Sequence, residues 1–213
     1  MKIISLIISL ILLITNGYAQ EFETLINRDV NSTTSYLGYG GPLLGATQIN
    51  KEFGLIIGGK GGVVINKKYS FGGIGFGMAN EPQFTGNNLS GNTNVPLQMS
   101  FGAGGVFFEY VFNIENLIHF SIPLNLMAGG INIYDSKTEI EIESSAFFII
   151  EPGINIDLNV SKHYIQSLYI SYRQVLGSSL VNLDDKNISG LNIGLIFKFG
   201  YYKIRAETKT SNI

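Results

Sequence analysis

The feature that most constrains the fold is a strict alternation of apolar and other residues over strand-length segments. Near the C-terminus, every second residue is apolar: Leu191, Ile193, Leu195, Phe197, Phe199 and Tyr201. The residues between them are mostly glycine, asparagine or lysine, and Ile196 is the one apolar exception. Successive side chains of a strand point to opposite faces, so a period of two predicts a strand with one apolar face. Segments 53–65, 118–134 and 145–159 show the same alternation.

Similar runs recur along the chain, with turn signals between them and without a helical period. We predict eight strands, at approximately 34–48, 53–65, 69–80, 97–112, 118–134, 145–159, 164–177 and 189–201. Each is at least as long as the roughly 9–11 residues that a membrane-spanning β-strand needs.

The connections between these runs are of two kinds. Short polar turns are predicted at 66–68, 113–117 and 161–163, and longer polar loops at 81–96, 135–144 and 178–188. The first loop, near Asn50 and Lys51, is short and is the exception. Short turns at one rim and longer loops at the other are typical of outer-membrane barrels. An even number of strands would place both ends of the barrel at the short-turn, periplasmic rim.

The N-terminus has the pattern of an export signal. Lys2 precedes an apolar run from Ile3 to Ile14, and small residues at Gly17 and Ala19 predict cleavage between Ala19 and Gln20. The run is shorter than the roughly 20 residues of a transmembrane helix. We therefore predict a signal peptide at 1–19, a periplasmic lead-in at 20–33, a barrel at 34–202 and a polar tail at 203–213. A mature chain without a long apolar helix can cross a membrane only as a closed barrel.

Alternation alone leaves the direction of the apolar wall open, because a soluble lipid-binding barrel would turn that wall inward. Two observations favour an apolar outside. The less apolar wall is rich in glycine, which suits a narrow lumen: Gly54, Gly58, Gly62, Gly73, Gly75, Gly77, Gly190, Gly194 and Gly200. Charged residues are only 14% of the chain, against roughly 25% in ordinary soluble domains. The predicted fold is an all-β, eight-stranded antiparallel up-and-down transmembrane β-barrel.

Six charged residues fall in the middle of predicted strands, on the wall assigned to the lumen. They are Lys60, Glu109, Glu151, Asp157, Arg173 and Lys198. The three cations and three anions could pair, whereas unpaired charges inside a lumen would be costly. One interpretation is a structural network that fixes the strand register, and the other is the gate of a narrow ion path. The structural interpretation is favoured, because the interior of an eight-stranded barrel is just wide enough for side chains.

In some strands the alternation changes parity. Met99, Phe101 and Ala103 share one parity, whereas Val106 and Phe108 have the other. A β-bulge at Gly104-Gly105 would explain the change, with similar bulges at Gly72-Gly73 and Gly129-Gly130.

The composition argues against several kinds of chemistry. The chain has no cysteine and only two histidines, His119 and His163, both predicted at the periplasmic end. Neither position suits a metal site or a catalytic centre near the outer leaflet. The net charge is -2 and no basic patch stands out, so nucleic acid is not an expected partner. We expect no enzyme activity, no cofactor and no metal.

Three short segments carry a resemblance to uncharacterised outer-membrane barrels of Bacteroidota. They are Gly58-Gly59-Lys60-Gly61-Gly62, Glu151-Pro152-Gly153 and Ser171-Tyr172-Arg173. The architecture as a whole is similar to the small barrels of the OmpA and OmpX type. The resemblance implies a Gram-negative cell envelope, with outer-membrane lipid, lipopolysaccharide and the barrel-assembly machinery as partners. Phe199 or Tyr201 could serve as the terminal aromatic residue that this machinery reads, although a polar tail follows.

The expected role is structural or interactive, with partners outside the cell reached through loops 81–96, 135–144 and 178–188. The alternatives are a narrow porin-like channel and, less favoured, a soluble secreted β-barrel that binds lipid.

Overall fold

The structure is a computed structural model that describes residues 35–87 and 95–200. The predicted signal peptide, lead-in and C-terminal tail lie outside the described residues. The strands are β1 (Tyr36–Ile49), β2 (Glu52–Ile65), β3 (Tyr69–Met78), β4 (Gln83–Gly86), β5 (Val95–Phe112), β6 (Ile118–Asp135), β7 (Glu141–Ser161), β8 (Tyr164–Leu176) and β9 (Gly190–Gly200), and α2 (Asp185–Ile188) is a short helix. In this part of the chain, no helix has the length and apolarity required to cross a membrane.

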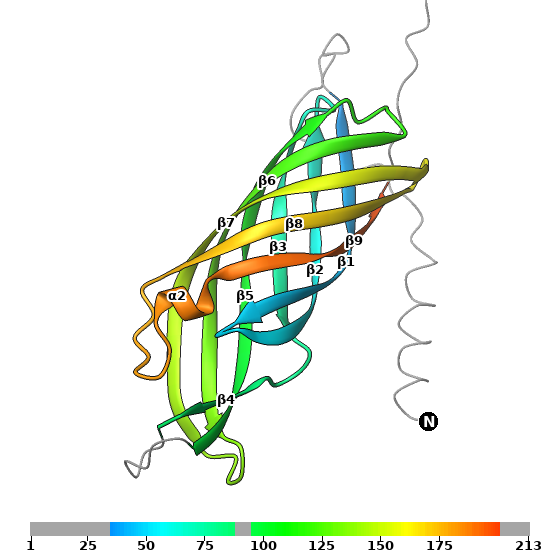
Figure 1. Ribbon diagram of the computed structural model, residues 1–213. Coiled ribbons are helices and arrows are strands. Elements are labelled where there is room, and N and C mark those ends of the chain that lie inside the picture. The colour runs from blue at the N-terminus through cyan, green and yellow to red at the C-terminus, as the bar shows by residue number, and fades with distance from the viewer. Residues whose placement is uncertain (1–34, 88–94, 201–213) are drawn as a thin grey trace, which may run out of the picture. The chain divides into compact units, whose positions relative to one another are not determined.

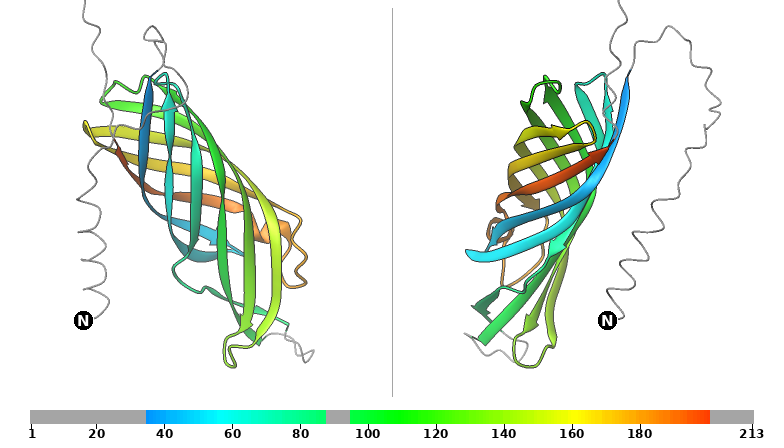
Figure 2. Two further views of the ribbon diagram at one scale, coloured as in Figure 1. Left: turned by 180° about the vertical axis from the view of Figure 1, so that it is seen from behind. Right: turned by 90° about the vertical axis from the view of Figure 1, so that its right-hand side faces the viewer.

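The strands form one antiparallel sheet that closes on itself (Figures 1 and 2). Its order is β3-β2-β1-β9-β8-β7-β6-β5-β4, and a further pairing between β3 and β5 completes the ring. Strand β4 pairs with the first residues of β5 and lies outside the ring. The closed ring therefore has eight strands, which confirms the predicted antiparallel β-barrel.

The predicted strands agree with the structure to within a few residues, and the main differences lie in the loops. Strand β7 begins at Glu141, inside the predicted loop 135–144. The predicted loop 81–96 contains β4, and the predicted loop 178–188 contains α2. Strands β5, β6 and β7 are also the longest, and their ends extend past the hairpin of β1 and β2 (Figure 1). We call this end of the barrel the loop end and the other the short-turn end.

In every strand of the ring, alternate side chains point into the lumen and to the outside. Ile154 and Ile193 on the outside are 57% and 49% exposed. Glu151 and Lys198 on the inside are 2% and 5% exposed. The outer wall is therefore apolar, which is the reverse of the arrangement in a soluble barrel.

The predicted β-bulges at paired glycines are wrong. Strand β5 pairs with β3 and β6 without a register shift through Gly104-Gly105, Gly72-Gly73 and Gly129-Gly130. The change of parity instead reflects the contents of the lumen. Met99 and Phe101 point inward into an apolar region near the loop end, whereas Val106 and Phe108 point outward.

The glycines of the strands fall into two groups, and only in one group does the packing leave no room for a side chain. A Cβ atom on inward-facing Gly58 would lie 2.1 Å from the Gly75 carbonyl oxygen, so only glycine fits there. The prediction that Gly73, Gly75 and Gly77 face the lumen is wrong, because Ile74 and Phe76 occupy the inward positions of β3. A Cβ atom on outward-facing Gly75 would lie 3.6 Å from its nearest neighbour, the Ala103 carbonyl oxygen, which is an ordinary contact.

Candidate functional site

Four of the six charged residues predicted in the lumen form one cluster in its short-turn half. Lys60 Nζ lies 2.6 Å from Glu109 Oε2. Lys198 Nζ lies 3.2 Å from Glu109 Oε1 and 2.8 Å from Asp157 Oδ1. All four side chains are buried and come from four different strands, β2, β5, β7 and β9. The cluster therefore joins both sides of the barrel through its interior.

Neutral side chains that the sequence analysis did not single out complete this cluster. The Ser121 hydroxyl contacts Glu109 Oε1 at 2.6 Å and Asp157 Oδ2 at 2.8 Å. Asn155 Nδ2 donates to Glu109 Oε1 at 3.0 Å, and Ser167 donates to Asp157. The ring of Phe107 lies 4.1 Å from Lys60 Nζ, a cation–π contact. Their position on the inward parity of each strand was the signal that could have identified them.

Glu151 lies farther along the lumen and is bound by neutral donors alone. It accepts hydrogen bonds from the Ser171 hydroxyl at 2.7 Å, Asn125 Nδ2 at 3.3 Å and Asn192 Nδ2 at 3.0 Å. Among the described residues, no cationic nitrogen lies within 4.0 Å of its carboxylate. Asn192 also accepts a hydrogen bond from Arg173 Nη1 at 3.2 Å, so it bridges Glu151 and Arg173.

Arg173 is fully buried and binds the connections at the loop end. Its Nη2 and Nε atoms donate to the Ile188 carbonyl oxygen at 2.7 and 3.0 Å. Nη1 donates to the Thr47 hydroxyl at 3.0 Å, and Nη2 donates to the Gln48 carbonyl oxygen at 3.3 Å. The guanidinium therefore joins α2 and the end of β1 to the lumen.

Residues 177–189, which include α2, form a cap over the loop end. Leu183 and Ile188 of the cap are buried in the apolar core. The Glu143 carboxylate accepts hydrogen bonds from the backbone N–H groups of Val181 and Asn182, at 2.9 and 3.3 Å. The Asn182 side chain pairs with both backbone groups of Asn87, at 2.9 and 3.1 Å. These contacts bind the cap to β7 and to the segment after β4.

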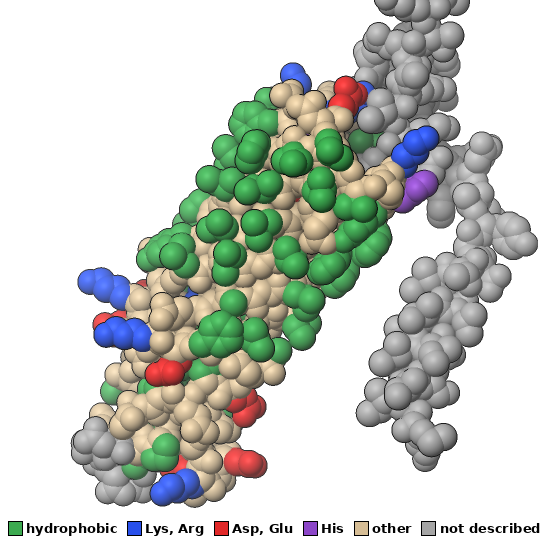
Figure 3. Space-filling model, turned by 45° about the vertical axis from the view of Figure 1, so that its right-hand side comes forward, with side chains coloured by type: hydrophobic (Ala, Val, Ile, Leu, Met, Phe, Trp, Pro, Cys, Tyr) green, Lys and Arg blue, Asp and Glu red, His purple; other side chains and the backbone are tan. Residues whose placement is uncertain are grey.

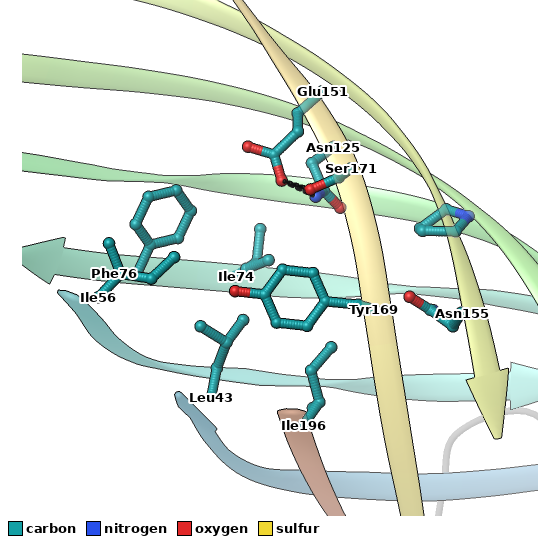
Figure 4. A pocket seen from close by; sticks show the side chains of 11 residues that line it. Leu43, Ile56, Ile74, Phe76, Asn125, Glu151, Asn155, Tyr169, Ser171 and Ile196 are labelled. Carbon is teal, nitrogen blue, oxygen red and sulfur yellow. Dashed lines mark hydrogen bonds between the residues drawn. The ribbon is translucent and has the colours of Figure 1, made fainter. Parts of the chain in front are cut away.

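The lumen is filled along its length. Beneath the cap lies an apolar layer: Leu97, Met99, Phe101, Ile131, Ile133, Phe147, Ile149 and Val175. Among the described residues, one cavity of about 10 Å³ lies in the middle of the lumen (Figure 4), and another of about 10 Å³ lies beside the cluster of Glu109, Asp157 and Lys198. Each has about the volume that one water molecule requires. The large apolar share of the filling differs from the predicted lumen, which was expected to be filled by small and paired charged residues.

The arrangement supports charge pairing better than covalent chemistry. His119 Nε2 lies 3.8 Å from Asp157 Oδ2, but the Ser121 hydroxyl contacts carboxylates and not His119. These three residues therefore lack the relay geometry of a nucleophilic site. In residues 35–87 and 95–200, no group of three or more metal-ligating side chains comes together.

No known protein family matches the sequence, and no curated protein is similar to it in sequence. The structure is similar to several solved barrels at low identity. Ail, the attachment invasion locus protein of Yersinia pestis, shares 12% identity at a TM-score of 0.45, over 78% of this chain and 97% of Ail. Neisserial surface protein A shares 10% identity at a TM-score of 0.49, over 79% and 99% of the two chains. Outer membrane protein OprG of Pseudomonas aeruginosa shares 10% identity at a TM-score of 0.44, over 79% of this chain and 96% of OprG.

Proposed function

We propose that the chain is a small barrel of the Gram-negative outer membrane, with a structural or interaction role and a closed lumen. The observation that carries this proposal is the apolar outer wall. Phe53, Phe148 and Leu191 are 61%, 71% and 64% exposed, and large apolar side chains cover the middle of the barrel (Figure 3). A wall of this extent is far larger than the apolar patches of soluble monomers. A lipid bilayer is the environment that would cover it.

The two ends of the apolar wall support the placement in a membrane. Aromatic side chains face outward near the short-turn end, at Tyr36, Tyr69, Tyr110, Phe112 and Phe199. Interfacial aromatic girdles of this kind flank the apolar band of membrane barrels. Towards the loop end, the outward positions become polar, at Gln98, Ser100, Asn132 and Ser144. This pattern supports a periplasmic short-turn end and an exposed cap.

The filled lumen favours a structural or interaction role over a porin-like channel. A continuous path would require displacement of the bridge between Lys198 and Asp157 and also of the cap held by Arg173. The cap and the neighbouring hairpin of β6 and β7 would then be the parts presented to partners outside the cell. The hairpin carries Ile140 and the cap carries Val181, which are 57% and 86% exposed.

Fractionation of cells that express the full chain tests the proposal. We expect the protein in the outer-membrane fraction, with faster electrophoretic mobility before heating than after heating. Release into the periplasm or medium would contradict a membrane barrel. Recordings on planar bilayers test the closed lumen separately, because steady conductance by the purified protein would favour the channel.

A further inference from the structure

In the part of the chain that the structure describes, three buried polar atoms have no hydrogen-bond partner, and their residues line the central cavity of the lumen. They are Asn125 Oδ1, Asn155 Oδ1 and the Tyr169 hydroxyl. All three residues line the same cavity of about 10 Å³, together with Glu151 and apolar side chains such as Leu43 (Figure 4). Buried polar groups in folded proteins nearly always have a partner, so two amide oxygens without one in the same cavity indicate a bound polar ligand.

The orientation of both amides follows from their other contacts. Asn125 Nδ2 donates to Glu151 Oε1 at 3.3 Å, and Asn155 Nδ2 donates to Glu109 Oε1 at 3.0 Å. Carboxylate oxygens accept hydrogen bonds, so a flip of either amide would bring two acceptors together. The two Oδ1 atoms therefore remain as acceptors that need a donor.

We propose that buried water occupies this cavity and is the partner of the two amide oxygens, Asn125 Oδ1 and Asn155 Oδ1. A water molecule donates two hydrogen bonds, which matches the two amide oxygens. The Tyr169 hydroxyl lies at the end of its ring away from Asn155, close to Gly45 of β1, and is not counted among the partners of this water (Figure 4). The cavity has room for about one molecule at that volume. A monovalent cation fits less well, because the buried lumen charges already balance. The three buried cations, Lys60, Lys198 and Arg173, equal in number the three buried anions, Glu109, Asp157 and Glu151. An added cation would leave one uncompensated charge in a low dielectric.

The water joins two hydrogen-bond networks that direct contacts among residues 35–87 and 95–200 leave separate. Asn155 belongs to the cluster of Glu109 and Lys198, and Asn125 belongs to the network of Glu151. Glu151 continues through Asn192 to Arg173, and Arg173 continues to Ile188 of the cap. Water between Asn125 and Asn155 would make one polar network from the short-turn half of the lumen to the cap. This inference does not depend on where in the cell the barrel resides.

A high-resolution crystal structure of the full barrel, grown with rubidium chloride in place of sodium chloride, tests the ligand directly. We expect a density peak within hydrogen-bonding distance of Asn125 Oδ1 and Asn155 Oδ1, without anomalous signal at the rubidium absorption edge. An anomalous peak would identify a cation and overturn the proposal. An empty cavity with well-defined side chains would overturn it as well.

Magnetization transfer from water in lipid nanodiscs provides a second test. We expect cross-peaks between water and the side-chain amide protons of Asn125 and Asn155 in the native protein. The Asn155 signal should weaken in Asn125→Leu, which removes one partner of the water, and stay unchanged in Asn132→Leu, at an outward position of the same strand. Native protein without such cross-peaks, or equal signals in the two variants, would count against this site.

Discussion

The guanidinium of Arg173 binds the carbonyl oxygen of Ile188 with two nitrogen atoms, Nη2 at 2.7 Å and Nε at 3.0 Å. Ile188 is the last residue of α2, so a buried charge in the lumen holds a segment of the exposed cap. Ile188 itself is fully buried in the apolar core. The polar and apolar contacts of one residue thus fix the cap in the same position.

Replacement of Arg173 by methionine should destabilise the barrel and loosen the cap. Hydrogen bonds to a charged group contribute about 1.5–3 kcal/mol each, so the loss of two predicts a decrease of about 3 kcal/mol or more in the free energy of unfolding. Urea titration in lipid vesicles measures the change, with the electrophoretic mobility of unheated samples as the readout of folding. Lys186→Met, at an exposed position of the same helix, is the matched control. Equal midpoints for the two variants would contradict a role for Arg173 in holding the cap.

Two adjacent glycines of β2 should respond differently to alanine. A Cβ atom on inward-facing Gly58 would lie 2.1 Å from the Gly75 carbonyl oxygen and 2.5 Å from Phe76 Cβ. Overpacking of this kind costs about 1–3 kcal/mol. A Cβ atom on outward-facing Gly59 would lie 3.5 Å from the Gly41 carbonyl oxygen, its nearest neighbour. Gly59→Ala should therefore be neutral, or stabilise by up to about 1 kcal/mol through the unfolded chain. Urea titration measures the free energy of unfolding of both variants. Similar losses in Gly58→Ala and Gly59→Ala would refute this assignment of faces.

The strands and their orientation could be predicted because a strand has a short, strict period that the sequence displays directly. Leu191, Ile193 and Leu195 identify the outer face of β9 without any knowledge of their neighbours. Lys60 and Lys198 could be assigned to the lumen for the same reason. Their pairing with Glu109 and Asp157 depends on the barrel register, which the local pattern does not contain.

The cap and the apolar layer could not be predicted, for two physical reasons. Helix α2 has four residues, too few for a helical period, and Ile188 meets Arg173 through a backbone carbonyl that no side-chain pattern reveals. Met99 and Val106 are both apolar but face opposite sides of β5, because the lumen is apolar at one end and polar at the other. The assumption that the inner wall is the less apolar one along its whole length therefore led to predicted bulges, although the strand is regular.

A lysine on the outer wall should be costly only if lipid surrounds that wall. Ile193 points outward from β9 and is 49% exposed, so Ile193→Lys would place an ammonium group in the apolar band. In membrane barrels, such a charge costs about 2–4 kcal/mol at the midplane. Val181→Lys, in the cap at 86% exposure, is the control and should be close to neutral. Refolding into vesicles measures both variants, and an Ile193→Lys protein as stable as native would argue against a lipid-facing wall.

The lumen cluster should show strong coupling between Lys60 and Glu109. Glu109→Gln removes the carboxylate that faces both Lys60 and Lys198, and the loss of one partner of a buried pair costs about 3–5 kcal/mol. Lys60→Met with Glu109→Gln removes one of the cations left unpaired, so the double variant should lose less than the sum of the single variants. Additive losses in the double-mutant cycle would show that the two side chains act independently.

Acid should loosen the cap through Asp185, which lies outside the strands. The Ser178 side chain and the backbone N–H groups of Gly177 and Ser178 bind this carboxylate and hold its pKa below the usual value. A carboxyl group with a lowered folded pKa stabilises the fold above its unfolded pKa of about 3.9. That contribution is lost as the pH falls through the lower folded pKa. Hydrogen exchange at the amides of Gly177 and Ser178, relative to the intrinsic rate, should therefore accelerate as the pH falls below about 4.

Asp185→Asn separates this effect from that of Glu143, another carboxylate that binds the cap. The variant should already exchange faster at Gly177 and Ser178 at neutral pH, and acid should change that exchange much less than in the native protein. Asp184→Asn is the matched control, because the Asp184 side chain makes no capping hydrogen bond to α2. If Asp185→Asn kept native protection at neutral pH, the hydrogen bonds to this carboxylate would not be what orders the start of the cap.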